Sequence, residues 1–143
     1  MTNQAHGTAT NASDRQREPA TDQTITSTHH GVVRGHVVTA VGVLRNRLAE
    51  PWTLDSLAEE VHLSRSQLAR AFDATVGTSP MAYLRKMRVE RMARLLATTD
   101  LSIAEAARAV GWTNQFHASQ VFHVAFGVSP TEYRRRQAVP PIA

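Results

Sequence analysis

The stretch GTSPMAY occupies residues 77–83, and GVSPTEY occupies residues 127–133. Glycine, serine, proline and tyrosine recur in the same order fifty positions apart, and Phe72 and Phe122 precede the two stretches at the same spacing. Serine followed by proline is typical of a helix start, because serine caps the first turn and proline tolerates the first helical position. Chance explains this agreement poorly, so we expect two copies of one helical unit.

The repeat extends towards the amino terminus, where Ala58 matches Ala107 at an offset of forty-nine. Each copy then reads as a short helix, a turn and a second helix, which is the layout of a helix-turn-helix motif. The turn requires a residue that tolerates positive φ. Gly111 provides it in the second copy without steric cost, and His62 provides it less easily in the first.

Cap and stop signals divide the chain after Pro51 into short helices. Ser64 with Gln67 and Ser102 with Glu105 have the spacing of capping boxes. These signals predict a first helix-turn-helix over about residues 54–76, a linker helix over about 80–98 and a second helix-turn-helix over about 102–126. The linker helix carries two apolar stripes, Leu84-Met87-Leu95 and Val89-Met92-Leu96, and is expected to pack on both sides.

The first fifty residues change character part of the way along. Residues 1–31 are polar, so we expect a disordered tail, since such a segment buries too little apolar surface to offset its ordering entropy. Val37, Val41, Leu44 and Leu48 then recur at helical spacing, although the Val-Val-Thr run at 37–39 also fits a strand. A domain over residues 32–137 and a C-terminal tail over 138–143 complete the expected organisation.

Composition excludes several classes of protein. The 143 residues contain no cysteine, which removes disulfide frameworks, thiol nucleophiles and thiolate metal sites. No apolar run approaches the length of a membrane span and no signal peptide is visible, so we expect a cytoplasmic, nucleoid-associated protein. Fifteen arginines and one lysine against twelve acids give a net charge of +4. This basic balance fits nucleic-acid binding or an even spread of solvated arginines.

Residues 51–136 resemble the DNA-binding domain of the AraC/XylS family of bacterial transcription regulators. The similarity lies in Leu57-Ala58-x-x-Val61, Ser64-x-x-x-Leu68-x-Arg70-x-Phe72, Gly77-x-Ser79-Pro80-x-x-Tyr83-Leu84, Arg88, Ala93-x-Leu95-Leu96, Ile103-x-x-Ala106-Ala107-x-x-Val110-Gly111-Trp112 and Phe122-x-x-x-Phe126-Gly127-x-Ser129-Pro130-x-x-Tyr133-Arg134. The resemblance implies an all-α domain of seven helices, in which a long linker helix joins two helix-turn-helix subdomains.

It also implies that two recognition helices enter neighbouring major-groove segments on one face of duplex DNA. Residues 66, 69 and 70 share one face of the first recognition helix, opposite its apolar residues. Arg65 and Arg70 are the strongest candidates, because arginine donates two hydrogen bonds to guanine or contacts phosphate. An ion pair of Arg70 with Asp73 or Glu59 is the alternative. The candidate DNA-binding residues of this helix are Ser64, Arg65, Ser66, Gln67, Ala69 and Arg70.

The second recognition helix departs from the family's pattern. Ala118 stands where the family usually carries a bulky aromatic side chain, and Gln120 where it usually carries arginine. We expect Phe116 to fill the resulting gap in the core by a shifted packing. Gln120 keeps the groups that read adenine but brings no charge to phosphate. The candidate DNA-binding residues here are Thr113, Asn114, Gln115, His117, Ser119 and Gln120.

These features predict a sequence-specific regulator of transcription that binds duplex DNA as a monomer and acts as an activator touching RNA polymerase. The alternative is a protein-interaction module that keeps the fold, as an antagonist or partner of another regulator, with weak or no specific DNA binding. The basic run at residues 134–136 fits either DNA-backbone contacts or a solvated helix end.

Other functional classes find no support in the residues. No metal-ligand pair, nucleophile–base set or phosphate-binding glycine loop is visible, so we expect no enzyme activity, no metal and no cofactor. Residues 1–50 are too few and too polar for a separate effector-binding domain. The chain is therefore expected to be a standalone regulator or a fragment of a longer one.

Overall fold

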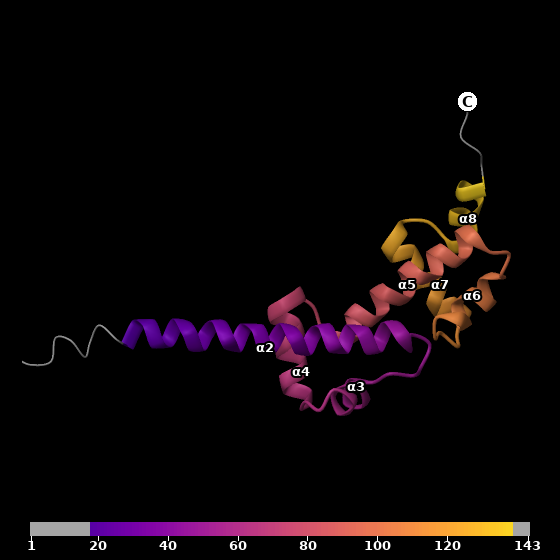
Figure 1. The fold of residues 1–143 in the computed structure, drawn as a ribbon. Helices are drawn as coiled ribbons and strands as arrows, with labels where there is room; N and C mark the ends of the chain where they lie inside the picture. Colours follow the sequence, from indigo (N-terminus) through magenta and orange to yellow (C-terminus); the bar gives the residue numbers. More distant parts are fainter. Residues whose placement is uncertain (1–17, 139–143) are drawn as a thin grey trace, which may run out of the picture.

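The computed structural model describes residues 18–138, with side chains from residue 28 onward. Within these residues the chain forms seven helices and no strand, which confirms the all-α prediction (Figure 1). The helices are α2 (Glu18–Asn46), α3 (Leu54–Glu60), α4 (Arg65–Val76), α5 (Pro80–Thr98), α6 (Ile103–Ala109), α7 (Gln115–Phe126) and α8 (Pro130–Ala138). None of the described helices is long and apolar enough to cross a membrane.

Helix α2 begins earlier than the sequence predicts. It starts at Glu18, inside the segment expected to be a disordered tail, and residues 1–17 and 139–143 lie outside the described part of the chain. No proline interrupts the sequence between Pro19 and Pro51, so nothing in that interval blocks helical hydrogen bonding. Residues 37–39 are helical, and the strand alternative for them is wrong. The burial of Val37 against the first core explains why the helical periodicity prevails there.

The first subdomain has its own core, built by α2, α3, α4 and the beginning of α5. Leu44, Leu57, Leu68 and Phe72 have no exposed surface, and Leu84 closes the cluster from α5. Helix α2 lies across α4 in Figure 1, which is the most extensive helix pair of this half. Burying side chains of this size contributes about 1.5–3 kcal/mol each.

The second subdomain repeats the arrangement around α6, α7 and α8. Met92, Val110 and Phe122 are fully buried at its centre. The repeated tyrosine of each unit packs its edge on the repeated phenylalanine. Ring centroids lie 5.8 Å apart for Phe72 and Tyr83 and 5.3 Å apart for Phe122 and Tyr133. The sequence repeat is therefore a repeat of one packing unit.

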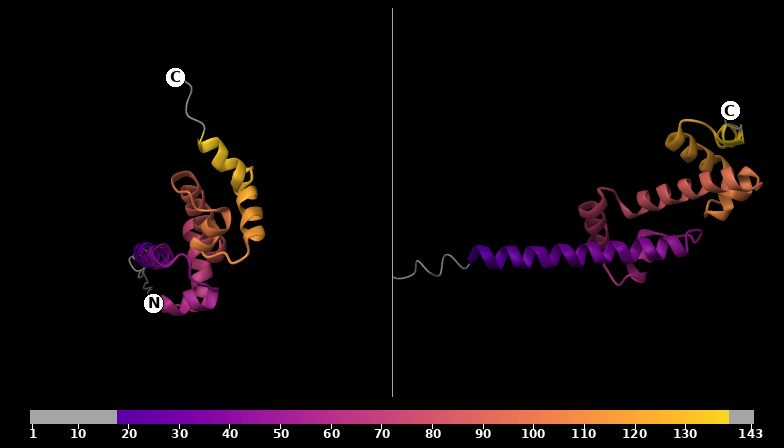
Figure 2. Two further views of the ribbon diagram at one scale, coloured as in Figure 1. Left: turned by 90° about the vertical axis from the view of Figure 1, so that its right-hand side faces the viewer. Right: turned by 45° about the horizontal axis from the view of Figure 1, so that its top comes forward.

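Helix α5 joins the two subdomains, as the paired view in Figure 2 shows. Its apolar residues divide along its length. Leu84 and Met87 pack into the first core, whereas Leu95 and Leu96 pack into the second. The two stripes predicted from the sequence thus differ from the observed division, because Leu84 and Leu95 belong to different cores. A helix that passes from one core to the next needs apolar residues at its beginning on the side that faces the first core, and at its end on the side that faces the second.

The turns carry the backbone conformations that the sequence indicates. His62 has a φ of +60° and Gly111 a φ of +105° between the two helices of their motifs. Gly77 and Gly127 end helices α4 and α7 in the left-handed region, at φ values of +74° and +76°. The equivalent glycines of the repeat therefore perform the same task in both subdomains.

Candidate nucleic-acid interface

The start of α4 is held by a capping box. The hydroxyl of Ser64 accepts a hydrogen bond from the Gln67 amide at 3.1 Å, and the Gln67 side chain accepts one from the Ser64 amide at 2.9 Å. These two predicted site residues therefore use part of their hydrogen-bonding capacity to fix the helix end. The side-chain amide nitrogen of Gln67 faces solvent as a donor.

The remaining candidates on α4 lie on its solvent face. Arg65, Ser66 and Arg70 are exposed and Ala69 is half-buried, while Leu68 is completely buried on the opposite side. This confirms the face that the helical spacing predicts. A surface of two arginines, one serine and one alanine fits the major groove, because the small residues leave room for base edges.

The two arginines of α4 are held differently. Arg65 makes an ion pair with Asp55 of α3 at 3.0 Å, with both side chains largely exposed. An exposed pair of this kind is weak, about 0–1 kcal/mol, so it does not prevent a contact with DNA. Arg70 donates from Nε to the Ser66 carbonyl at 3.3 Å. Among residues 28–138, Arg70 makes none of the ion pairs that were its structural alternative.

Helix α7 starts with Asn114 as its cap. The Asn114 side-chain oxygen accepts hydrogen bonds from the Phe116 amide at 2.9 Å and the His117 amide at 3.1 Å. Asn114 is thereby committed to the helix end through its oxygen. The other predicted residues of this helix stay near solvent: Thr113, Gln115, His117 and Gln120 are exposed, and Ser119 is half-buried.

The predicted packing of Phe116 is wrong. Its side chain is 80% exposed, whereas Ala118 is completely buried in the second core beside Phe122. Two positions along an α-helix turn the side chain by about 200°, so a residue that precedes a buried position by two faces away from the core. The small Ala118 is accommodated by the core itself, and Phe116 is left on the outer face of α7.

The structure adds two basic residues that the sequence analysis did not select. Arg85 and Lys86 of α5 border an apolar hollow of about 470 Å³, whose α7 wall includes His117 and Gln120. Neither basic side chain makes a hydrogen bond or ion pair within residues 28–138. The sequence shows two adjacent basic residues on the linker helix. It does not show that they lie beside α7, because this depends on how the two helices cross.

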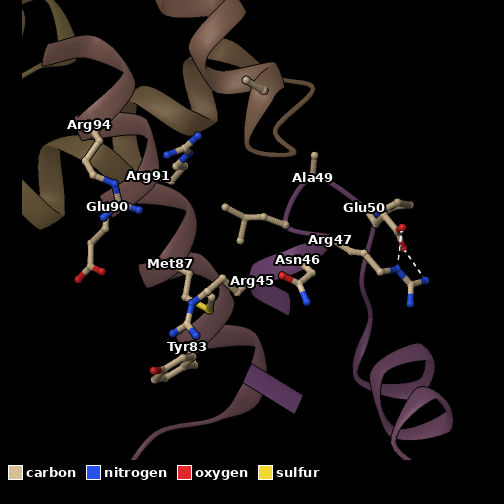
Figure 3. A pocket seen from close by; sticks show the side chains of 13 residues that line it. Arg45, Asn46, Arg47, Ala49, Glu50, Tyr83, Met87, Glu90, Arg91 and Arg94 are labelled. Carbon is tan, nitrogen blue, oxygen red and sulfur yellow. Dashed lines mark hydrogen bonds and ion pairs between the residues drawn. The ribbon is translucent and has the colours of Figure 1, made fainter. Parts of the chain in front are cut away.

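A second concave region lies elsewhere on the molecule and contains none of the predicted site residues. It is a cleft of about 1000 Å³ where the end of α2 meets α5 and α6. Figure 3 shows Arg45 near Tyr83 and Met87 in this cleft, with Arg91 and Arg94 on the neighbouring part of α5. These arginines form a basic surface that includes no residue of α4 or α7.

Arg47 also lines that cleft but is fixed by its neighbours. Its guanidinium contacts the carboxylates of Glu50 at 2.8 Å and Glu60 at 2.6 Å, and it lies 4.8 Å from the Trp52 ring centroid. The hydrogen bond to Glu50, and after it the one to Glu60, raises the pKa of Arg47. The same bond from Arg47 lowers the pKa of Glu50. Arg47 therefore acts as a link between α2 and α3.

Arg88 connects the two subdomains through backbone contacts. It donates from Nε to the Leu48 carbonyl at 3.2 Å and from Nη2 to the Glu50 carbonyl at 2.6 Å. Burial lowers the pKa of Arg88, and its guanidinium lies directly against the Gly111 turn. The turn of the second motif is thereby packed against the loop that precedes the first.

The basic run at residues 134–136 is used within the chain. Arg134 donates to the carbonyls of Leu96 at 3.1 Å and Thr99 at 3.3 Å, at the end of α5. Arg135 and Arg136 both pair with Glu132, at 2.9 Å and 3.2 Å. Arg134 is thus held within the chain, whereas Arg135 and Arg136 stay largely exposed, so for these two both interpretations of the basic run, DNA-backbone contacts and a solvated helix end, remain open.

Known proteins share this arrangement. A family model described as a helix-turn-helix domain matches residues 57–136. The crystal structure of a transcriptional regulator of Chromobacterium violaceum, described as having an AraC-type DNA-binding domain, is similar with a TM-score of 0.70 at 31% identity, over 76% of this chain and 96% of that one. The DNA-binding domain of AdpA, solved with a target DNA, gives a TM-score of 0.67 at 29% identity, over 69% and 89%.

Sequence relatives extend the similarity to longer proteins. A putative AraC-like transcription regulator of Streptomyces lividans is 36% identical over 104 residues, which are 73% of this chain and 34% of the relative. The chain spans about a third of the length of the curated relatives it matches.

Proposed function

Because the chain belongs to the AraC-type family of helix-turn-helix transcription regulators, we propose that it binds duplex DNA sequence-specifically and regulates transcription. Helices α4 and α7 read two adjacent major-groove segments. The observation that carries the proposal is the exposure of both recognition faces on a framework held by Arg88 and Gly111.

The dimensions of the linker support this mode of binding. Helix α5 has 19 residues, which corresponds to about 28 Å at a rise of 1.5 Å per residue. Successive major-groove segments on one face of B-DNA lie about 34 Å apart. One chain therefore suffices for an asymmetric site of about two helical turns, and we propose that it binds as a monomer.

Each recognition helix is assigned its own type of contact. Arg65 and Arg70 of α4 donate to guanine or to phosphate, and Gln120 of α7 forms the paired hydrogen bonds that read adenine. Arg85 and Lys86 lie beside α7, where the DNA backbone between the two groove segments passes the linker helix, and neutralise phosphates there.

The proposal extends to a role in the cell. The chain acts with the nucleoid in the cytoplasm as an activator, and its partner beyond DNA is RNA polymerase. No catalytic step, metal or cofactor enters this function. A run-off transcription assay with and without the chain, on a template that carries its selected site, tests the activator role by the direction of the change.

Selection of binding sites from a random duplex pool, using the whole purified chain, tests the central claim. We expect an enriched asymmetric motif of about two helical turns. Arg70→Ala should relax the selected bases in one half of the motif and Gln120→Ala those in the other. Failure to enrich any sequence at low salt would reject the proposal in favour of the protein-interaction module.

A further inference from the structure

Phe116 stands out among the aromatic side chains of residues 28–138, because it alone is exposed by more than half. It is the second residue of α7 and lies outside the core that contains Ala118. A phenyl group left in water forgoes the stabilisation of burial, and nothing in the described chain covers it. A side chain with this exposure is available to a partner surface.

The position of Phe116 on the helix identifies that surface. Phe116, Gln120 and Val124 follow each other at intervals of four, so they line one exposed face of α7. Gln120 on this face is the residue assigned above to read adenine. In a helix-turn-helix, the residues near the amino end of the recognition helix contact base edges. Phe116 therefore belongs to the same surface as Gln120, one turn closer to that end.

The chemistry of α7 indicates which base this face reads. Its twelve residues contain no arginine or lysine, so it lacks the side chains that most often pair with guanine. In the major groove the apolar group that distinguishes a base is the C5 methyl of thymine, and apolar side chains such as phenylalanine contact it. An adenine-reading glutamine beside an apolar ring fits an A·T step.

We infer that Phe116 is a specificity-determining residue that packs on the C5 methyl of a thymine in the second half-site, next to the adenine read by Gln120. This inference rests on the proposed function and adds the base composition of one half of the target. The target is asymmetric in chemistry: the half read by α4 contains guanine for its arginines, and the half read by α7 contains an A·T step.

Deoxyuridine tests the contact directly, because it differs from thymidine only by the missing methyl group. The whole chain is titrated, with fluorescence anisotropy as readout, against the selected duplex and against duplexes in which each thymine is replaced in turn. Removing one buried methyl should weaken binding about fourfold, which is about 0.8 kcal/mol converted at 1.36 kcal/mol per tenfold. We expect this loss at one thymine of the second half-site.

The variant F116A should bind the unmodified duplex less tightly and lose the deoxyuridine effect at that thymine. V124A is the matched control, since Val124 is 85% exposed on the same face two turns further from the helix start. It should keep the effect. Circular dichroism of both variants should match the parent chain, because neither side chain belongs to a core.

The outcomes separate this inference from the proposed function. If the pool yields a motif but deoxyuridine is tolerated throughout, or weakens binding equally for F116A, methyl reading by Phe116 is wrong while specific DNA binding stands. A uniform weakening of F116A on all duplexes, with the deoxyuridine effect intact, would also overturn it. If the pool yields no motif, the proposed function and the inference fall together.

Discussion

Replacing Gly111 by alanine tests how the turn of the second motif is held. Gly111 has a φ of +105°, a conformation that L residues rarely adopt. A Cβ at this position would lie 2.8 Å from Arg88 Nη2, 2.9 Å from Arg88 Cζ and 3.0 Å from the Ala49 Cα. Contacts this short require either the guanidinium or the backbone to move. The substitution therefore combines backbone strain with the displacement of a half-buried guanidinium.

The two contributions have different sizes. The strained conformation costs at least about 1–2 kcal/mol for a non-glycine residue. Displacing the Arg88 guanidinium sacrifices hydrogen bonds to the Leu48 and Glu50 carbonyls, and a hydrogen bond from a charged donor contributes about 1.5–3 kcal/mol. The added Cβ lies nearest Nη2, so we expect the bond to Glu50 to be lost and G111A to lower the free energy of unfolding by about 2.5–5 kcal/mol in total. This is a large part of the 5–15 kcal/mol typical of a domain.

Urea unfolding followed by far-ultraviolet circular dichroism measures the effect. With a slope of about 2 kcal/mol per molar urea, the midpoint should fall by roughly 2 M. Gly77 provides the matched control. It also has a positive φ, +74°, but a Cβ there would meet no heavy atom within 4 Å. G77A should therefore lose only the strain, about 1–2 kcal/mol.

A double variant separates strain from steric conflict. In R88A the guanidinium is absent, so adding G111A should cost less than it does in the parent chain, although the strain at Gly111 and the approach to the Ala49 backbone remain. Each single variant loses hydrogen bonding by Arg88, but the double variant can lose it only once. The destabilisation of the double variant should therefore be smaller than the sum of the two single effects by that hydrogen-bond contribution. Equal losses for G111A and G77A in the parent chain, within about 0.5 kcal/mol, would refute the close approach of Arg88 to the turn.

Three further predictions concern helix α2, the α5 surface and the cap of α6. Gly42→Ala should raise the free energy of unfolding by about 0.5–1 kcal/mol in the same urea assay, because Gly42 is helical and has open space around its Cβ. Replacing Arg85 and Lys86 by alanine should weaken binding to the selected duplex and reduce the slope of log affinity against log salt by about 1 for each phosphate that is no longer neutralised. Hydrogen bonds from the Ser102 backbone and side chain lower the pKa of Glu105. The stability that Glu105 contributes is therefore present above its unfolded-state pKa and lost as pH falls through its lower folded-state pKa. The urea midpoint should therefore fall between neutral and acid pH in the parent chain, and this fall should be smaller in E105Q.

Each of these has a control or a contradicting result. Alanine at both Arg91 and Arg94 removes the same charge from the separate cleft of Figure 3 and should leave the salt slope unchanged. An equal change of slope in both double variants would deny Arg85 and Lys86 a specific role. A fall in stability for G42A would contradict the open space on α2, and an identical acid loss for E105Q would remove Glu105 from the pH dependence.

The helix starts could be predicted because their causes are local. Ser64 with Gln67 and Ser102 with Glu105 form the capping boxes that their spacing indicates, with all four hydrogen bonds between 2.8 and 3.1 Å. A cap involves residues three positions apart, so the sequence contains both partners. The repeated phenylalanine and tyrosine are equally informative, since one packing unit occurring twice leaves its pattern twice.

The errors arise where packing between distant segments decides. The prediction that Phe116 fills the core assumes a gap beside Ala118, but whether a gap exists depends on the helices that surround Ala118. Helical phase alone places Phe116 outside, and this signal is present in the sequence. The approach of Arg88 to Gly111, 23 positions further along the chain, follows from three-dimensional neighbours that no local pattern records.

The basic balance of the chain illustrates the difference between composition and structure. A net charge of +4 is compatible with DNA binding and with an even spread of solvated arginines. In the structure several basic groups already hold other parts of the chain: Arg47, Arg88, Arg134, Arg135 and Arg136 bind carboxylates or carbonyls. Arg85 and Lys86 form no such interaction within residues 28–138.

This division bears on how the chain meets a phosphate backbone. A guanidinium that holds two backbone carbonyls can neutralise a phosphate only by giving up those hydrogen bonds, whereas a side chain without internal partners does so at the cost of its own ordering. Counterion release, and with it the salt dependence of binding, should therefore come from the second group. Arg65 lies between the two groups, because its single partner is an exposed carboxylate that it can give up at little cost. We therefore expect fewer phosphate contacts than the number of arginines in the sequence suggests.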